Sequence, residues 1–134
     1  MATFHLQIVA PDRVAYDGQA ESILVRTVTG DVEILARHID YTAPLGIGQA
    51  IVKTEDGTER YAACNSGLIS VSGNEVRVIT CTFEWQEEID LARAEAAKAK
   101  AEEELKKLPK TDENYALMDA KMKRAIARMR AGRY

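Results

Sequence analysis

The sequence predicts an antiparallel β-rich domain over residues 1–84, built as a sandwich or flattened barrel, and a helical hairpin over residues 85–134. Turn signals interrupt the first part at short intervals, between runs rich in β-branched side chains, as in antiparallel sandwiches and barrels. The last third instead holds two long runs of helical composition, which meet at Pro109. These observations together predict a β body that carries a helical appendage.

The predicted strands begin with an alternating pattern, in which Phe4, Leu6 and Ile8 are separated by polar neighbours. Turn signals follow at Asp17-Gly18, Thr29-Gly30-Asp31, residues 44–48, Asp56-Gly57, Ser66-Gly67 and Gly73-Asn74. The strands predicted between them are Ser22–Val28, Gln49–Thr54, Glu59–Ala63, Leu68–Val71 and Glu75–Cys81. Asp56-Gly57 is a good hairpin signal, because this dipeptide readily adopts the positive φ angles of a tight hairpin turn.

The two cysteines and two histidines predict no metal or redox site. Cys64 and Cys81 are too few for a zinc site and too far apart for a CxxC pair. Cys81 closes an apolar run, and we expect it to be a buried strand residue. His5 and His38 have no ligand-type residues at metal-binding spacing, so we place them on a strand surface and in a loop. Because no catalytic triad or positioned carboxylate pair can be assembled, we predict a non-catalytic protein.

Two helices are predicted, over residues of about 89–108 and 112–131. The first contains six alanines, which favour a helix but bury little surface, and it ends at Pro109. Thr111 is the expected N-cap of the second helix. Side chains at three-to-four spacing should pack the second helix against the alanine-rich face of the first; they are Tyr115, Met118, Met122, Ala125, Ile126 and Met129.

Charge is distributed unevenly along the chain. Residues 1–88 contain 6 Lys and Arg against 13 Asp and Glu, whereas residues 89–134 contain 12 against 8. The basic residues after Ala120 are Lys121, Lys123, Arg124, Arg128, Arg130 and Arg133, with no acidic residue among them. This end favours an acidic partner or a plain solvated helix end; few aromatics accompany it, which argues against nucleic acid. No apolar stretch of about 20 residues occurs, so we predict no membrane insertion.

Several segments, taken in order, are similar to one known family. They are Phe4–Val9, Gly30–His38, Asn65–Val71 and the run Asn74-Glu75-Val76-Arg77-Val78-Ile79. The whole chain resembles the epsilon subunit of the bacterial rotary (F-type) ATP synthase. The resemblance implies a sandwich of about ten strands and a helix-turn-helix, in a non-catalytic central-stalk subunit. It also implies a peripheral location in the complex, on the cytoplasmic face of the bacterial cell membrane.

The resemblance further implies partners and regulation. The sandwich would hold the gamma subunit and touch the c-ring, and the hairpin would permit ATP hydrolysis when folded and block it when extended among the catalytic alpha and beta subunits. The inhibitory basic face would be Lys121, Lys123, Arg124 and Arg128, and the c-ring contact Asp31, Glu33 and His38. Glu33 and Ala36 replace a glycine and a proline of the family, which should alter this loop locally.

The most specific segment is Ile89-Asp90-x-x-Arg93-Ala94, which is similar to the nucleotide-binding motif of ATP-sensing epsilon subunits. By this resemblance the ATP-binding residues are Glu84, Ile89, Asp90, Arg93, Ala94, Arg124 and Arg128. Lys100 stands where those relatives have an arginine. No P-loop is present, so side chains must form any nucleotide site, with ATP as a regulatory ligand and no cofactor required. The alternative is a solvated helical face on which Asp90 only stabilises the helix start.

A second interpretation of the whole chain stays open at this point. It is a free-standing module, in which a sandwich and a hairpin capture an acidic or nucleotide ligand without any motor. The two interpretations differ in one simple property, because a stalk subunit should co-purify with gamma and a free module should elute alone.

Overall fold

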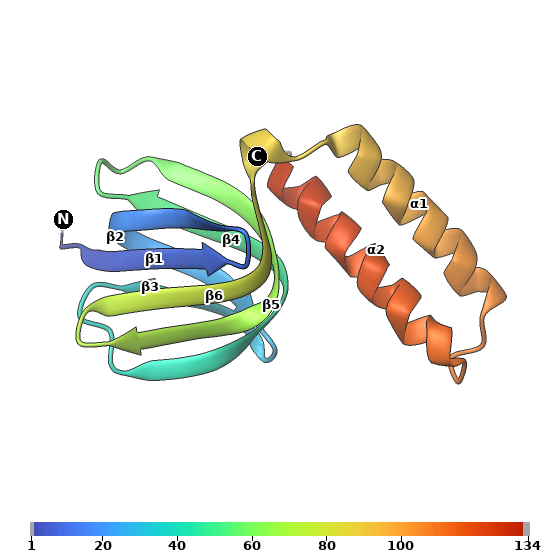
Figure 1. Cartoon of the computed structure of the whole chain (residues 1–134), viewed down its shortest axis with the longest axis horizontal. Coiled ribbons are helices and arrows are strands. Elements are labelled where there is room, and N and C mark those ends of the chain that lie inside the picture. Colours follow the sequence, from blue (N-terminus) through green and yellow to red (C-terminus); the bar gives the residue numbers. More distant parts are fainter. Residues whose placement is uncertain (1, 133–134) are drawn as a thin grey trace.

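The computed structural model describes residues 2–132 and shows a β-sandwich with a two-helix hairpin at one end (Figure 1). The strands are β1 (Phe4–Ala10), β2 (Arg13–Thr27), β3 (Gly30–Leu35), β4 (Tyr41–Thr54), β5 (Glu59–Ser72) and β6 (Glu75–Trp85). A short 3₁₀ helix, η1 (Gln86–Glu88), leads to α1 (Leu91–Lys107), and α2 (Glu113–Gly132) returns antiparallel to it. The predicted fold class, a sandwich followed by a helical hairpin, is confirmed.

The strands pair in the order β1-β6-β5-β4-β2-β3, and a further pairing of β1 with the first half of β2 closes the sheet on itself. β1 lies parallel to β6, whereas the other strand pairs in the described part of the chain are antiparallel. The expected antiparallel arrangement therefore holds with the exception of one pair. β2 pairs first with β1 and then runs between β3 and β4, so a single long strand joins the two layers.

The sandwich contains six strands in the described residues, fewer than the ten or so expected, because three predicted turns lie inside long strands. Asp17-Gly18 lies within β2, residues 44–48 within β4, and Ser66-Gly67 within β5. Ser66 and Gly67 have φ angles of 56° and 139°, so they bend β5 without ending it. Residues that favour turns therefore act here as bulges, which let one strand pass from layer to layer.

The core of the sandwich consists of large apolar side chains from every strand. The side chains of Phe4, Leu6, Ile8 and Ile23 are at most 1% exposed. Cys81, predicted to be buried, is exposed, because β6 alternates and directs Val76, Val78 and Thr80 inward and the intervening residues outward. Cys64 is the buried cysteine, and its burial raises the pKa of the thiol to about 12.

Trp85 is the last residue of β6 and joins the sandwich to the hairpin. Its indole is 5% exposed, contacts Phe83 edge-on, and donates a hydrogen bond of 3.2 Å to the carbonyl of Ala15. The guanidinium of Arg60 lies 3.8 Å from the centre of the ring. Two ion pairs then fix η1 to the sandwich, Arg13 with Glu88 and Arg60 with Glu87, both at 2.8 Å.

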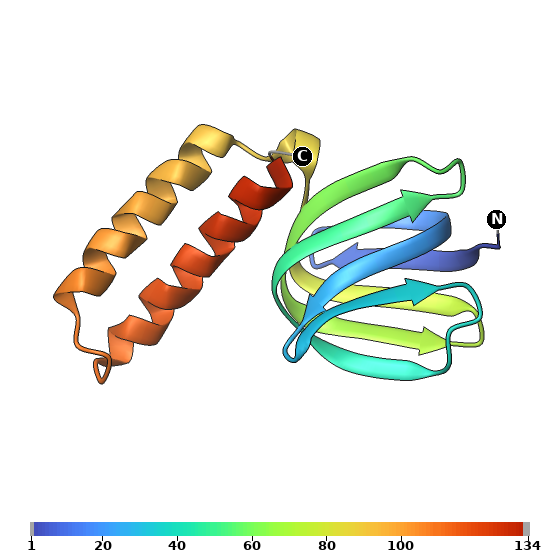
Figure 2. The same ribbon diagram turned by 180° about the vertical axis from the view of Figure 1, so that it is seen from behind.

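The hairpin contacts the sandwich through α2, which lies against β4 and β5 (Figure 2). The contact is formed by Ala63, Ala127 and Ala131, with Ile47 and Ile89 packed around them. Asp112, and not the predicted Thr111, caps α2, because its carboxylate accepts the backbone N–H of Asn114 at 2.8 Å. Neither helix of the described chain is long and apolar enough to cross a membrane.

Candidate functional site

The hairpin and the last strand enclose a hollow of about 350 Å³, which we term the carboxylate hollow. It is lined by Glu84, Glu88, Asp90, Arg93, Ala94, Ala97 and Arg128. The start of α1 supplies Asp90, Arg93 and Ala94, whereas β6 supplies Glu84 and α2 supplies Arg128. Three elements that are distant in sequence therefore meet at this hollow.

Two interactions define the geometry of the carboxylate hollow. Asp90 caps α1, because its Oδ1 accepts the backbone N–H of Arg93 at 3.1 Å. The guanidinium Nε of Arg128 donates to Oε1 of Glu84 and forms an ion pair that joins α2 to β6. One carboxylate oxygen of Asp90 and the guanidinium of Arg93 thus stay available for a ligand, since no side-chain partner of Arg93 is found within residues 2–132.

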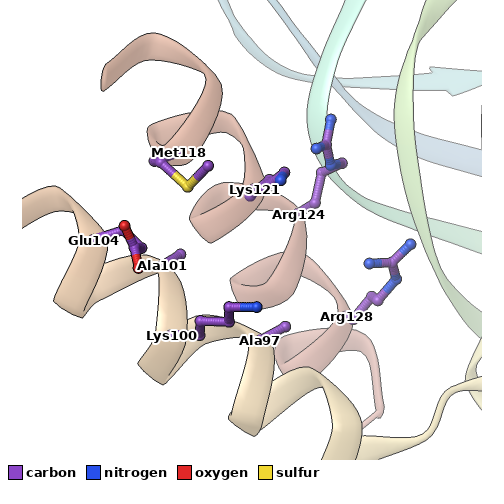
Figure 3. Close-up of a pocket in the computed structure, with 8 residues that line it drawn as sticks. All are labelled: Ala97, Lys100, Ala101, Glu104, Met118, Lys121, Arg124 and Arg128. Carbon is purple, nitrogen blue, oxygen red and sulfur yellow. The ribbon is translucent and has the colours of Figure 1, made fainter. Parts of the chain in front are cut away.

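A second hollow of about 380 Å³, the cationic hollow, continues along the hairpin between α1 and α2 (Figure 3). Its lining is Ala97, Lys100, Ala101, Glu104, Met118, Lys121, Arg124 and Arg128. In Figure 3, Lys100 reaches from α1 toward α2, where Arg124 and Arg128 extend side by side. Four cationic side chains and one carboxylate line this space, which suits a ligand with several negative charges.

The three residues expected at a c-ring contact do not gather at one place. Asp31 starts β3 and pairs with Arg26 at 2.8 Å, beside a hollow that α2 also lines. His38 follows the other end of β3, where its ring contacts that of Tyr41 edge-on. β3 has 6 residues, which corresponds to about 20 Å at about 3.3 Å per residue. Asp31 and His38 therefore lie at opposite ends of the strand, with Glu33 exposed between them.

The outer face of the sandwich carries an apolar row that the sequence analysis did not single out. Strand register places its members side by side, and they are Val14, Val9, Ile79, Leu68, Pro44 and Val28. Four of these side chains are 39–64% exposed. Each one belongs to a different strand or turn, so a sequence window shows only single outward-facing apolar residues. Contiguous exposed apolar surface of this kind marks a contact site for another protein.

Comparison with known proteins gives a family for both parts of the chain. Residues 3–86 match the family described as ATP synthase, Delta/Epsilon chain, beta-sandwich domain, and residues 87–132 match its long alpha-helix domain. The chain belongs to the ATP synthase delta/epsilon family. The ATP synthase epsilon chain of Caldanaerobacter subterraneus subsp. tengcongensis is 38% identical over 128 residues, covering 96% of this chain and 92% of the relative. That of Alkaliphilus oremlandii is 46% identical over 104 residues, covering 78% and 77%.

Solved structures agree with the fold of this delta/epsilon chain. A chain of the Euglena gracilis mitochondrial ATP synthase superposes with a TM-score of 0.85 at 20% identity, covering 100% of this chain and 83% of that one. A chain from the central stalk and c-ring of the Tetrahymena thermophila mitochondrial ATP synthase gives a TM-score of 0.60 at 11% identity, covering 96% and 95%. At these identities the likeness establishes the shared architecture of sandwich and hairpin.

Five of the seven residues predicted to bind ATP line the carboxylate hollow: Glu84, Asp90, Arg93, Ala94 and Arg128. Arg124 lines the adjoining cationic hollow, and Ile89 instead packs on the alanine contact between α2 and the sandwich. The motif did not indicate Glu88, which lies between Arg13 and this hollow, or Lys121. Their positions in the sequence could have indicated both residues, because Glu88 precedes Asp90 by two residues and Lys121 precedes Arg124 by one helical turn.

The four residues expected to form one inhibitory basic face lie on two sides of α2. Lys121, Arg124 and Arg128 line the cationic hollow toward α1. Lys123 points instead to the sandwich side, beside Asp31, and pairs with Asp119 at 3.1 Å. In the folded hairpin, α2 therefore presents its basic residues in two directions.

His5 lies on the strand surface, as expected, and holds three strands together. Its Nε2 lies 2.6 Å from Asp17 on β2, and its Nδ1 lies 2.6 Å from Glu75 on β6. Hydrogen bonds to Asp17 and then Glu75 raise the pKa of the imidazole above its ordinary value of 6.5. No cluster of side chains that could hold a metal ion is found in the described residues.

Proposed function

We propose that this chain is a non-catalytic central-stalk subunit of a bacterial F-type ATP synthase, peripheral on the cytoplasmic face of the membrane, whose hairpin inhibits ATP hydrolysis when it leaves the sandwich. The observation that carries this proposal is the small contact between hairpin and sandwich. Three alanines and two partly buried isoleucines form it, and within residues 2–132 one ion pair, Glu84–Arg128, reinforces it. A contact of this size leaves docked and undocked states within a few kcal/mol, where a ligand can shift their populations.

ATP bound in the carboxylate and cationic hollows would hold the hairpin in the docked position. Glu84 belongs to β6, whereas Asp90, Arg93 and Arg128 belong to the hairpin, so a ligand that touches them all joins the two parts. Binding to one state only stabilises that state by mass action. High ATP would therefore keep the hairpin folded, and falling ATP would release it to inhibit hydrolysis.

Calorimetric titration of ATP and ADP into the full chain tests the sensing step. We expect saturable binding that prefers ATP and that is lost in Arg93→Ala, because the guanidinium of Arg93 lines the hollow and has no side-chain partner within residues 2–132. Arg77→Ala is the matched control, since this arginine lies on the outer face of β6. No binding at millimolar ATP would end the sensing proposal and leave the stalk role intact.

Hydrolysis by the assembled complex tests the inhibitory step. If the basic residues of α2 contact the catalytic alpha and beta subunits, Arg124→Ala together with Arg128→Ala should relieve inhibition. The loss of Arg128 also breaks its pair with Glu84, which by itself would favour undocking. Glu84→Gln separates the two effects, because it breaks the same pair and leaves both arginines in place. We expect stronger inhibition in Glu84→Gln and weaker inhibition in the double variant; equal behaviour would contradict the proposal.

We propose that the apolar row is the contact surface for gamma, while the c-ring contact extends along β3, from Asp31 through Glu33 to His38 beyond its other end. The row supports this assignment because it is exposed in the isolated chain and nearly free of charge, like the centre of a protein interface. Ile79→Glu should abolish co-purification with gamma. Ile39→Glu is the control, being 79% exposed and outside the row. If the unaltered chain does not bind gamma, a free-standing module becomes the better interpretation.

A further inference from the structure

The two hollows adjoin along the hairpin, and we term them together the hairpin groove. Ala97 and Arg128 line both hollows, so the two spaces are neighbours at these residues. From this junction, one end extends toward the start of α1 and the other toward Glu104 and Met118, nearer the connection between the two helices. An elongated ligand can therefore occupy both spaces at once.

The two ends of the hairpin groove differ in charge. One end carries three carboxylates, Glu84, Glu88 and Asp90, together with the guanidinium of Arg93, and its carboxylate oxygens can accept hydrogen bonds from neutral donors such as a base or a ribose. The other end carries Lys100, Lys121 and Arg124 with the single carboxylate of Glu104. Such a groove fits a ligand that is uncharged and hydrogen-bonding at one end and polyanionic at the other.

Lys121 stands at the cationic end, far from Asp90. It shares a helical face with Arg124 and Arg128, since these residues are three and seven positions further along α2. Seven residues correspond to about 10 Å along the helix axis. Lys121 is exposed, and no ion pair within residues 2–132 engages it, whereas Lys123 is paired with Asp119. Its ammonium group is therefore free to meet a negative charge at the far end of a bound ligand.

We propose that Lys121 recognises the terminal phosphate of a nucleoside triphosphate in the hairpin groove and so discriminates triphosphates from diphosphates. This inference rests on the proposed binding of ATP at the hairpin. The order of side chains along the groove carries it: acceptors for the nucleoside at the start of α1, Arg128 at the junction, and Arg124, Lys100 and Lys121 beyond. Removing one phosphate shortens the ligand at the end where Lys121 stands. Only a triphosphate then reaches this ammonium group.

Calorimetry on the full chain with Lys121→Gln provides the test. We expect the affinity for ATP to fall about tenfold and that for ADP to change less than about twofold, because one charge-assisted contact is lost for ATP alone. Lys123→Gln is the matched control, two residues away on the other side of α2, and both affinities should stay unchanged. An equal loss for both nucleotides, or no loss for ATP, would overturn the role of Lys121. Circular dichroism checks that each variant is folded.

Inorganic tripolyphosphate distinguishes a failure of this inference from a failure of the proposed function. We expect it to compete with ATP and to lose affinity in Lys121→Gln, since it presents the polyanionic end alone. If the unaltered chain binds neither ATP nor tripolyphosphate, both the sensing function and the role of Lys121 are overturned. If it binds ATP, and Lys121→Gln keeps the same preference for ATP over ADP, only the role of Lys121 is overturned.

Discussion

The sandwich and the hairpin differ in the side chains that they bury. The sandwich core contains Phe4, Leu6, Ile8 and further large side chains that are almost fully enclosed. The buried residues of α1 and α2 are all alanines. Burial of a large apolar side chain contributes roughly 1.5–3 kcal/mol, and an alanine methyl much less. One chain therefore combines a body that holds its shape with an appendage whose docking is easily reversed.

The ion pairs also differ between the linker η1 and the hairpin. Arg13–Glu88 and Arg60–Glu87 fix η1 to the sandwich, so the linker stays in place. Beyond η1, the ion pair between hairpin and sandwich within the described residues is Glu84–Arg128. Movement of the hairpin should therefore begin after Glu88, where Ile89 separates η1 from the cap of α1.

The largest expected effect comes from the sandwich core. Phe4→Ala should lower the free energy of unfolding by about 3–5 kcal/mol, because it removes a ring that is 1% exposed and leaves a cavity. Met118→Ala, in the hairpin, should lower it by less than about 1 kcal/mol. Urea unfolding followed by the fluorescence of Trp85, the single tryptophan, measures both. Similar losses in the two variants would show that the hairpin and the sandwich unfold as one unit.

The second-largest expected effect comes from the bend in β5. Gly67 has a φ of 139°, and a Cβ at this position would clash with the carbonyl oxygen of Ile79 on β6. Gly67→Ala should therefore cost about 3 kcal/mol, from backbone strain and a forced shift of the neighbouring strand. Gly57→Ala separates these contributions, since Gly57 has a φ of 87° but a Cβ added there would meet no atom beyond its chain neighbours within 4 Å. We expect about 1–2 kcal/mol there. Equal costs in urea unfolding would mean that the close approach to β6 has no effect.

The contact between hairpin and sandwich can be broken without loss of the sandwich. Ala127→Glu places a charge at a site that is 5% exposed against β5, and burying it without a partner costs more than undocking the hairpin. We expect faster hydrogen exchange in α2 with unchanged exchange in β1 and β6, and stronger inhibition of hydrolysis in the complex. Ala116→Glu, on the exposed side of α2, is the control. Protection of α2 that equals the unaltered protein would contradict a separable hairpin.

Local sequence predicted the hairpin better than the strands, for a physical reason. Pro109 and the capping residue Asp90 act on their own helix, so their effects are visible in sequence. Asp17-Gly18 and Asp56-Gly57 carry the same residues, yet the first lies within β2 and the second turns between β4 and β5. Pairing with distant strands decides between them, and a short window holds no information about that pairing.

The candidate site, too, could be predicted only in part from the local sequence. The motif around Asp90 and Arg93 indicated the residues of the groove that lie on the first turn of α1. The family resemblance added Glu84, Arg124 and Arg128. Lys121 and Glu88 enter only when α2 folds back on α1 and η1 approaches β6. The apolar row depends on register across five strands, since Ile79 becomes part of a surface only beside Leu68 and Val9. Surfaces assembled from several strands need the structure.

The smallest expected effect concerns the ion pairs that His5 forms on the surface of the sandwich. Its imidazole lies between Asp17 and Glu75, which are on different strands, and the carboxylates raise its pKa above 6.5 in the folded state. A raised folded pKa means that the folded protein holds this proton more tightly than the unfolded chain does. The contribution to stability is therefore fully present below pH 6.5, and it is lost as the pH rises through the folded pKa.

Urea unfolding at several pH values measures this contribution. We expect the midpoint of the unaltered protein to fall modestly as the pH rises above 6.5, and His5→Gln to remove that part of the pH dependence. His38→Gln, which changes the other histidine, should keep it. Because His5 is partly exposed, added salt should weaken the effect by screening the charges. A fall of the same size in His5→Gln would assign the pH dependence to other groups, and it would show that β1, β2 and β6 are held together by backbone pairing and core packing alone.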